Sequence, residues 1–178
     1  MRPSIATFKL ASAFTVPDDA DPVDWTDDSL RLTPVIAERF CDETNNISIS
    51  ALDTKDIILR AGVYEVTMEV HAESDAPQGQ GNKGISIAIT DGAGVVLDDA
   101  ELEYFIKVGL TETDPLVDDT SSGTVCVRAI VELTTDQLES TTSNIINFRA
   151  AQSTGTGNFT IHPASIGMIE KITNAGQS

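Results

Sequence analysis

The sequence contains few of the residues from which enzyme and metal sites are usually built. Of its 178 residues, two are histidines and two are cysteines. His71 and His162 do not form an HxH pair, and Cys41 and Cys126 do not form a CxxC pair, so no metal or redox motif is indicated. The GxSxG, HExxH and P-loop patterns are also missing. We therefore expect no enzymatic activity, no cofactor and no metal site.

Basic residues and long hydrophobic runs are also scarce. Lys and Arg number 11 against 28 Asp and Glu, which gives a formal net charge of −17. This balance argues against binding to nucleic acid or to an anionic membrane, because few side chains can neutralise phosphates. Residues 1–4 lead into strand-like sequence without the apolar stretch of a secretory signal. We expect synthesis in the cytoplasm without export, and two cysteines that are small, buried and reduced.

Helical periodicity is nearly absent, and alternation with a period of two takes its place. Residues 63–71 alternate apolar and polar side chains, residues 84–90 place Ile85, Ile87 and Ile89 on one face, and residues 124–133 repeat the pattern. A turn over residues 91–94 indicates a hairpin that continues at residues 95–97. The other strand candidates are 5–16, 46–49, 56–59, 143–150, 158–162 and 165–172, and the short helical candidates are 34–40 and 136–140.

This pattern predicts an all-β fold, an antiparallel β-sandwich of the jelly-roll kind. Aromatic residues make up 5% of the chain, so we expect the core to be mainly aliphatic. We interpret residues 18–178 as a single sandwich domain. Residues 1–17 form either an N-terminal arm or the first strand of the sandwich, and the two interpretations are compatible.

An acidic stretch between residues 18 and 28 has two interpretations. A solvated loop is favoured, because the spacing lacks the glycine and the final glutamate of an EF-hand loop. A calcium site is the alternative, because several carboxylates from one loop could supply the oxygen ligands that the ion needs. The aspartates concerned are Asp18, Asp19, Asp21, Asp24, Asp27 and Asp28.

Three segments resemble the tumour-necrosis-factor and C1q-like jelly-roll family. Residues 56–66 (DIILRAGVYEV) resemble its strand, glycine turn and Tyr-containing central strand, and residues 157–161 with 164–169 resemble its closing strand pair. Residues 125–133 and the acidic turn 134–138 are similar to another of its strands, although the glycine that the family has before Asp136 is missing. The resemblance covers residues 36–172.

The resemblance implies a homotrimer whose threefold axis is lined by apolar side chains. By position, these residues are Tyr64, Met68, Phe148, Ile166 and Met168. Packing within the core of a single chain is the alternative for each of them. Residues 166–169 independently suggest an interface or a central strand, because they are apolar on both strand faces.

Among proteins of this build, the chain most resembles capsid decoration (cement) proteins of tailed bacteriophages. This implies a virion structural protein on the capsid surface whose partners are two further copies of itself and the major capsid protein. Residues 1–17 could contact the capsid or add a strand to it, through Arg2, Phe8, Lys9 and Phe14.

A receptor- or glycan-binding fibre tip remains the alternative function, with Trp25, Tyr104 and Phe105 as the candidate aromatic contacts. An extracellular signalling ligand is disfavoured, because the sequence shows no leader, membrane anchor or collagen-like stalk.

Overall fold

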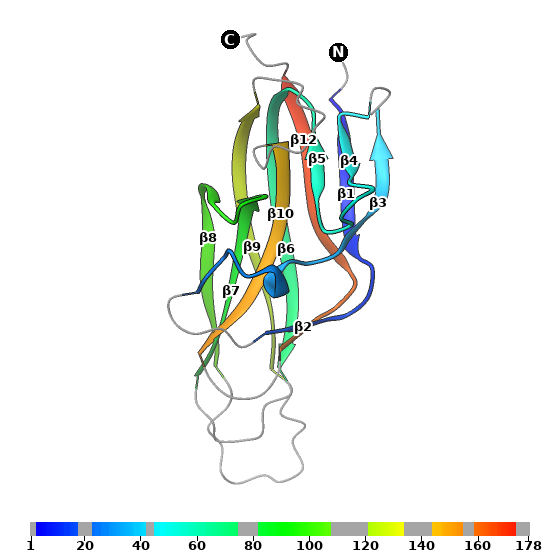
Figure 1. Cartoon of the computed structure of the whole chain (residues 1–178). Coiled ribbons are helices and arrows are strands. Elements are labelled where there is room, and N and C mark those ends of the chain that lie inside the picture. Colours follow the sequence, from blue (N-terminus) through cyan, green and yellow to red (C-terminus); the bar gives the residue numbers. More distant parts are fainter. Residues whose placement is uncertain are drawn as a thin grey trace, which may run out of the picture.

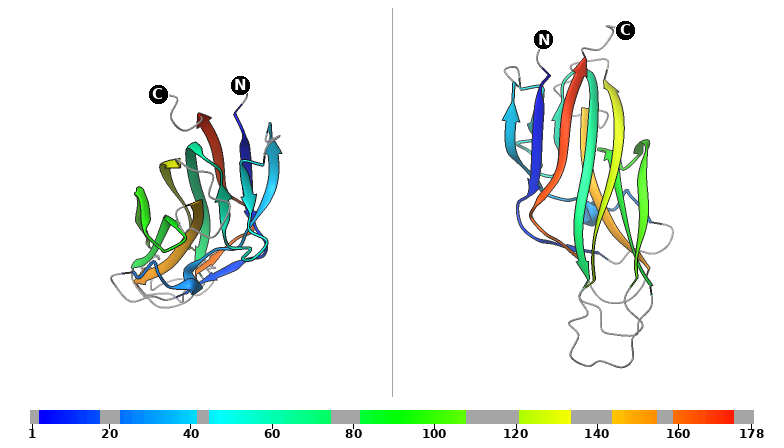
Figure 2. Two further views of the ribbon diagram at one scale, coloured as in Figure 1. Left: turned by 45° about the horizontal axis from the view of Figure 1, so that its top comes forward. Right: turned by 180° about the vertical axis from the view of Figure 1, so that it is seen from behind.

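Two antiparallel sheets packed face to face form the fold in the computed structural model, which describes residues 3–17, 23–41, 45–74, 82–107, 121–133, 144–154 and 159–173 (Figures 1 and 2). No helix within these ranges is long and apolar enough to span a membrane. The elements are β1 (Ile5–Leu10), β2 (Phe14–Val16), the 3-10 helix η1 (Asp28–Leu30), β3 (Pro34–Phe40), β4 (Ile47–Ile49), β5 (Ile57–Leu59), β6 (Gly62–Ser74), β7 (Asn82–Asp91), β8 (Val96–Lys107), β9 (Ser121–Leu133), β10 (Ile145–Thr154), β11 (Phe159–Ile161) and β12 (Ser165–Thr173).

The strand order brings together segments that are far apart in the sequence. The larger, seven-stranded sheet has the order β2-β11-β6-β12-β1-β3, with β9 paired to β6, and the five-stranded sheet has the order β4-β5-β10-β7-β8. β1 therefore lies between β12 and β3, and residues 3–17 supply two strands of the larger sheet. This arrangement confirms the antiparallel β-sandwich of the jelly-roll kind that the sequence predicts.

The alternation in the sequence decides which side chains lie between the sheets. Tyr64, Val66, Met68 and Val70 of β6 have no exposed surface, whereas the residues between them are partly or fully exposed. The apolar face predicted for β9 is likewise buried, with Val125, Val127, Ala129 and Val131 at most 8% exposed. Burying one apolar face of each strand supplies the main favourable free energy of this fold.

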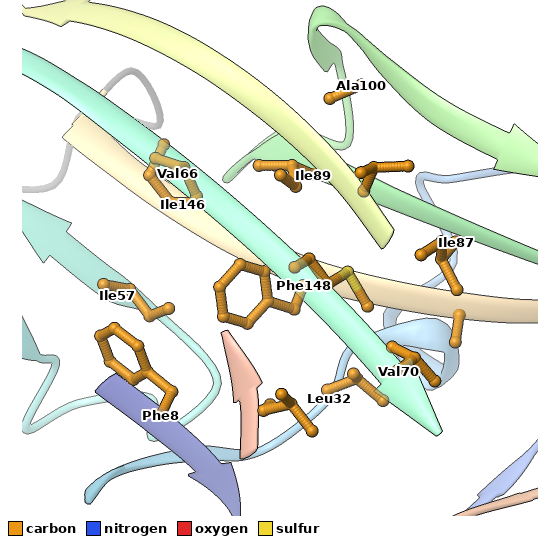
Figure 3. Packing of buried hydrophobic residues seen from close by; sticks show 14 of the residues in the cluster. Phe8, Leu32, Ile57, Val66, Val70, Ile87, Ile89, Ala100, Ile146 and Phe148 are labelled. Carbon is orange, nitrogen blue, oxygen red and sulfur yellow. The ribbon is translucent and has the colours of Figure 1, made fainter. Parts of the chain in front are cut away.

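Two phenylalanine rings from opposite sheets meet in the middle of the core (Figure 3). Phe8 of β1 and Phe148 of β10 pack edge to face, with ring centroids 6.0 Å apart and an interplanar angle of 82°. Phe148 also lies against the backbone of β12, where a Cβ atom on Gly167 would come within 2.7 Å of the ring. The missing side chain of Gly167 therefore makes room for Phe148.

The smaller sheet is covered on its outer side by residues 23–33, which we call the cover segment. This segment carries η1 across β10 in Figure 1, and its Trp25 and Leu30 pack against Ala88 of β7 and Ala151 of β10. The indole Nε1 of Trp25 donates a hydrogen bond to Oε1 of Glu101, at 2.8 Å. β7 is consequently buried on both faces over residues 84–90, and not only at the three isoleucines.

Two arginines anchor the cover segment to the strands below it. Arg149, 2% exposed, donates to Thr90 Oγ1 and to the backbone oxygen of Asp27, both at 2.9 Å. Arg31 contacts Asp28, and its Nη2 lies 2.9 Å from Asp53 Oδ2 and 2.6 Å from Asp56 Oδ1. These bonds give partners to guanidinium groups whose burial would otherwise oppose folding, although Nε of Arg31 is left without one.

Two predictions of local structure are wrong. Residues 34–40 form strand β3 and not a helix, because pairing with β1 overrides the weak helical pattern. Cys41 and Cys126 are both exposed, since Cys41 follows the edge strand β3 and Cys126 points outward from β9. The helical candidate at residues 136–140 lies outside the described residues.

Candidate interaction surface

The outer side of the larger sheet differs from that of the smaller sheet because no described segment covers it. The right panel of Figure 2 shows β3, β1, β12, β6 and β9 from this side, with no described element in front of them. We call this surface the open face. Because alternate residues of a strand point to opposite sides, its side chains are those that lie between the buried positions of each strand.

One row of the open face can be followed from edge to edge through the strand register. Ile5 is paired with Phe40 on one side and with Glu170 on the other, Glu170 with Glu65, and Glu65 with Ile130. Phe40 and Ile130, at the two ends of the row, are 50% and 42% exposed. The open face therefore presents a large apolar side chain near each edge and two carboxylates between them.

The neighbouring row places Met168 at the centre of the open face. Thr7 and Thr67 flank it on β1 and β6, and Arg128 follows on β9. Arg128 Nη2 lies 2.7 Å from Glu65 Oε2, which ties the two rows together and offsets the repulsion between Glu65 and Glu170 on adjacent strands. The pair lies at the surface, with the Arg128 side chain 59% exposed and that of Glu65 26% exposed, so it stabilises the chain by less than about 1 kcal/mol.

The structure places most of the expected trimer residues away from this surface. Tyr64, Met68 and Phe148 have no exposed surface and Ile166 is 1% exposed, because all four face the opposite sheet of their own chain. A side chain without exposed surface cannot contact a second copy, so this placement revises the expected set to Met168, which is half-buried. The polar residues that alternate with the buried ones, Glu65 and Thr67 among them, were the sequence signal for the open face.

The fold buries some of the expected capsid-binding residues and exposes another. Phe8 is fully buried, and Phe14 is half-buried and packs against the core. Lys9 is exposed on β1, and Arg2 lies outside the described residues. Because β1 is hydrogen-bonded to a strand on each side, residues 5–10 are an integral part of the sheet.

Both histidines lie on the larger sheet where β11 joins β6. The rings of His71 and His162 are 5.7 Å apart, and His162 Nε2 lies 2.7 Å from Glu73 Oε2. His71 Nδ1 is 3.3 Å from the hydroxyl of Thr124. Within the described ranges, no group of three or more His, Cys, Asp or Glu side chains is placed to hold a metal ion.

The described part of the acidic stretch makes local contacts. Asp24 accepts hydrogen bonds from the hydroxyl and the backbone N–H of Thr26, which lower the pKa of its carboxyl group. Lys55 and Arg31 lower the pKa of Asp28 in the same way. Asp27 caps η1 by accepting from the N–H of Ser29. Asp18, Asp19 and Asp21 lie outside the described residues.

Together these features define a jelly roll with one covered and one open sheet. The sequence matches no protein-family model and no curated protein. Among solved structures, the chain is similar to Eiger TNF from S. frugiperda, with a TM-score of 0.51 and 14% identity over 99% of this chain and 97% of that one. It is also similar to the PRD1 vertex protein P5, with a TM-score of 0.43 and 9% identity over 98% and 97%. The first similarity shows that the fold is a TNF-like jelly roll.

Proposed function

We propose that this chain is a virion structural protein that has no enzymatic activity. In its specific form, the proposal is a capsid decoration (cement) protein that binds the head shell of a tailed bacteriophage as a homotrimer. The observation that carries the proposal is the open face, where Phe40, Met168 and Ile130 are accessible on a rigid sheet. Apolar side chains that are exposed on one face and bordered by polar residues are typical of protein–protein interfaces.

The distribution of these residues favours a closed ring of copies. Phe40 lies on the edge strand β3 and Ile130 on β9, at opposite sides of the open face. A contact that joins the β9 side of one copy to the β3 side of the next uses two different patches, and such contacts form rings when the rotation closes. Three copies would each bury both patches.

In the proposed role, the trimer binds the assembled shell and not its separate subunits. A ligand that binds only the assembled state stabilises that state by mass action. Lys9 is the one expected capsid contact that the described residues show as exposed. We propose that it contacts the major capsid protein, which places this chain on the virion surface.

No observation favours the glycan-binding alternative. Trp25 is 6% exposed and its indole N–H is bonded to Glu101, so its ring cannot stack on a sugar without leaving the cover segment. For Tyr104 and Phe105 the structure describes the backbone, in β8, and not the side chains. Sugar stacking in this fold would need a different exposed aromatic surface.

Co-sedimentation with empty head shells of the phage that encodes the chain tests this function. We expect the purified chain to sediment with the shells and to raise the temperature at which they fall apart. Lys9→Gln should weaken this binding, whereas Lys55→Gln, which removes the same charge beside the cover segment, should not. A chain that leaves shell stability unchanged and remains in the supernatant would contradict the proposed function.

A further inference from the structure

Within the described part of the chain, one side of β9 is an unpaired strand edge. All 13 residues of β9 pair with β6 on one side, and no described strand is paired with β9 on the other. The N–H and C=O groups along such an edge are a template on which a strand of another molecule can be added. Ile130, 42% exposed on this strand, would add apolar contact area to such pairing.

Strand β8 lies beside this edge and is distorted there. Its pairing with β7 moves from Val96↔Thr90 to Ala88↔Glu101, so residues 97–100 of β8 stand opposite Ile89 alone. Within this bulge, Asp98 has a φ of 50° and Asp99 a φ of 53°. Two consecutive left-handed residues other than glycine are uncommon and strained, so the surrounding structure must hold them in place.

The bulge joins the edges of the two sheets. Asp98 Oδ2 accepts a hydrogen bond from the backbone N–H of Ile130, at 2.8 Å, and Ala100 points into the core with 4% of its surface exposed (Figure 3). Figures 1 and 2 show β8 and β9 side by side at this margin of the sandwich. The left-handed turn thus brings the Asp98 carboxylate to a donor of β9 that a new strand would need.

We propose that Asp98 closes the β9 edge against strand addition by a second copy of this chain. Its carboxylate occupies the Ile130 N–H, and the exposed carboxylates of Asp98 and Asp99 repel an identical edge. Two β9 edges would pair as a closed, two-fold dimer with one continuous sheet, whereas the closed edge leaves copies to associate by contacts other than strand pairing. The inference rests on the single chain and does not depend on the proposed capsid role.

A matched pair of glycine variants tests the inference. Asp98→Gly and Asp99→Gly each remove one carboxylate from a left-handed position that glycine adopts without strain, but only the first removes the bond to Ile130. Asp98→Asn keeps an acceptor oxygen and a residue that tolerates this conformation. Hydrogen exchange at the Ile130 amide and light scattering at increasing protein concentration are the two measurements.

We expect Ile130 in Asp98→Gly to exchange at least about tenfold faster than in Asp99→Gly, because its amide has lost its acceptor. Asp98→Gly should also form species larger than any in the wild-type protein. Asp98→Asn should not form these larger species. The inference is overturned if Asp98→Gly matches Asp99→Gly in either exchange or size distribution. Loss of the capsid activity alone, with both measurements as expected, would affect only the proposed function.

Discussion

At the scale of single residues, the core depends on the close approach of the Phe148 ring to the backbone at Gly167, which leaves no room for an added atom. A Cβ atom at position 167 would lie 2.7 Å from the ring of Phe148 and 2.9 Å from the backbone oxygen of Thr67. The backbone oxygen can move only with strand β6, which is paired on both sides. Gly167 is therefore required by packing and not by an unusual backbone conformation.

We predict that Gly167→Ala lowers the free energy of unfolding by about 1–3 kcal/mol, because the new methyl group overpacks the site. Urea unfolding followed by circular dichroism measures the change. In Gly167→Ala/Phe148→Leu the second substitution removes the ring that the methyl group meets, so the double variant should lose less stability than the sum of the single variants. The prediction would be wrong if Gly167→Ala were as stable as the wild type. It would also be wrong if the losses of the two single variants added up to that of the double variant, because the methyl group would then not clash with the Phe148 ring.

At the scale of elements, the cover segment makes the smaller sheet two-sided and depends on ionised aspartates. Lys55 and Arg31 lower the pKa of Asp28. Partial burial raises the pKa of Asp53, but the backbone N–H of Lys55 and the Arg31 side chain outweigh it and leave that pKa lowered. A lowered pKa in the folded state means that these carboxylates stabilise the fold above their unfolded pKa of about 3.9 and lose this effect as the pH falls further.

We therefore predict that Asp28→Asn lowers the melting temperature by about 1–3 °C at neutral pH, because it removes ion pairs at an exposed site. The difference from wild type should shrink as the pH falls from about 4 through the lowered pKa of Asp28, where this carboxyl group becomes protonated in the folded wild type. Thermal melts across this pH range, followed by the fluorescence of Trp25, measure it. Glu38→Gln is the control for the loss of one charge, and a difference that stays constant with pH would refute the prediction.

The elements also show what the sequence could reveal about the fold. The alternation in β6 and β9 predicted their buried faces, because each strand has one side in the core and one in solvent. It did not predict that Ser86 and Thr90 of β7 are buried, since the cover segment is brought over them only by tertiary structure. The alternation also did not predict that residues 34–40 form an edge strand. Their pairing partner, β1, is distant in sequence, so tertiary structure decides this pairing too.

At the scale of the whole molecule, the jelly roll was predictable but the contact surface was not. Tyr64 and Phe148 are large apolar residues whose spacing would suit either a trimer axis or a core, and the sequence alone does not separate the two. The open face became visible only through the register that aligns Phe40, Ile5 and Ile130 across distant strands. Lys9 was recognisable as a surface residue because it is the one charged residue of β1.

The solution mass of the purified chain, measured by light scattering at moderate salt, tests the proposed assembly most directly. Moderate salt screens the repulsion between copies that each carry a formal charge of −17. We predict a mass close to three times 19.0 kDa, because three copies would bury the apolar patches at both sides of the open face. A uniform mass of 19.0 kDa at all concentrations would contradict the trimer and the contact surface assigned to it.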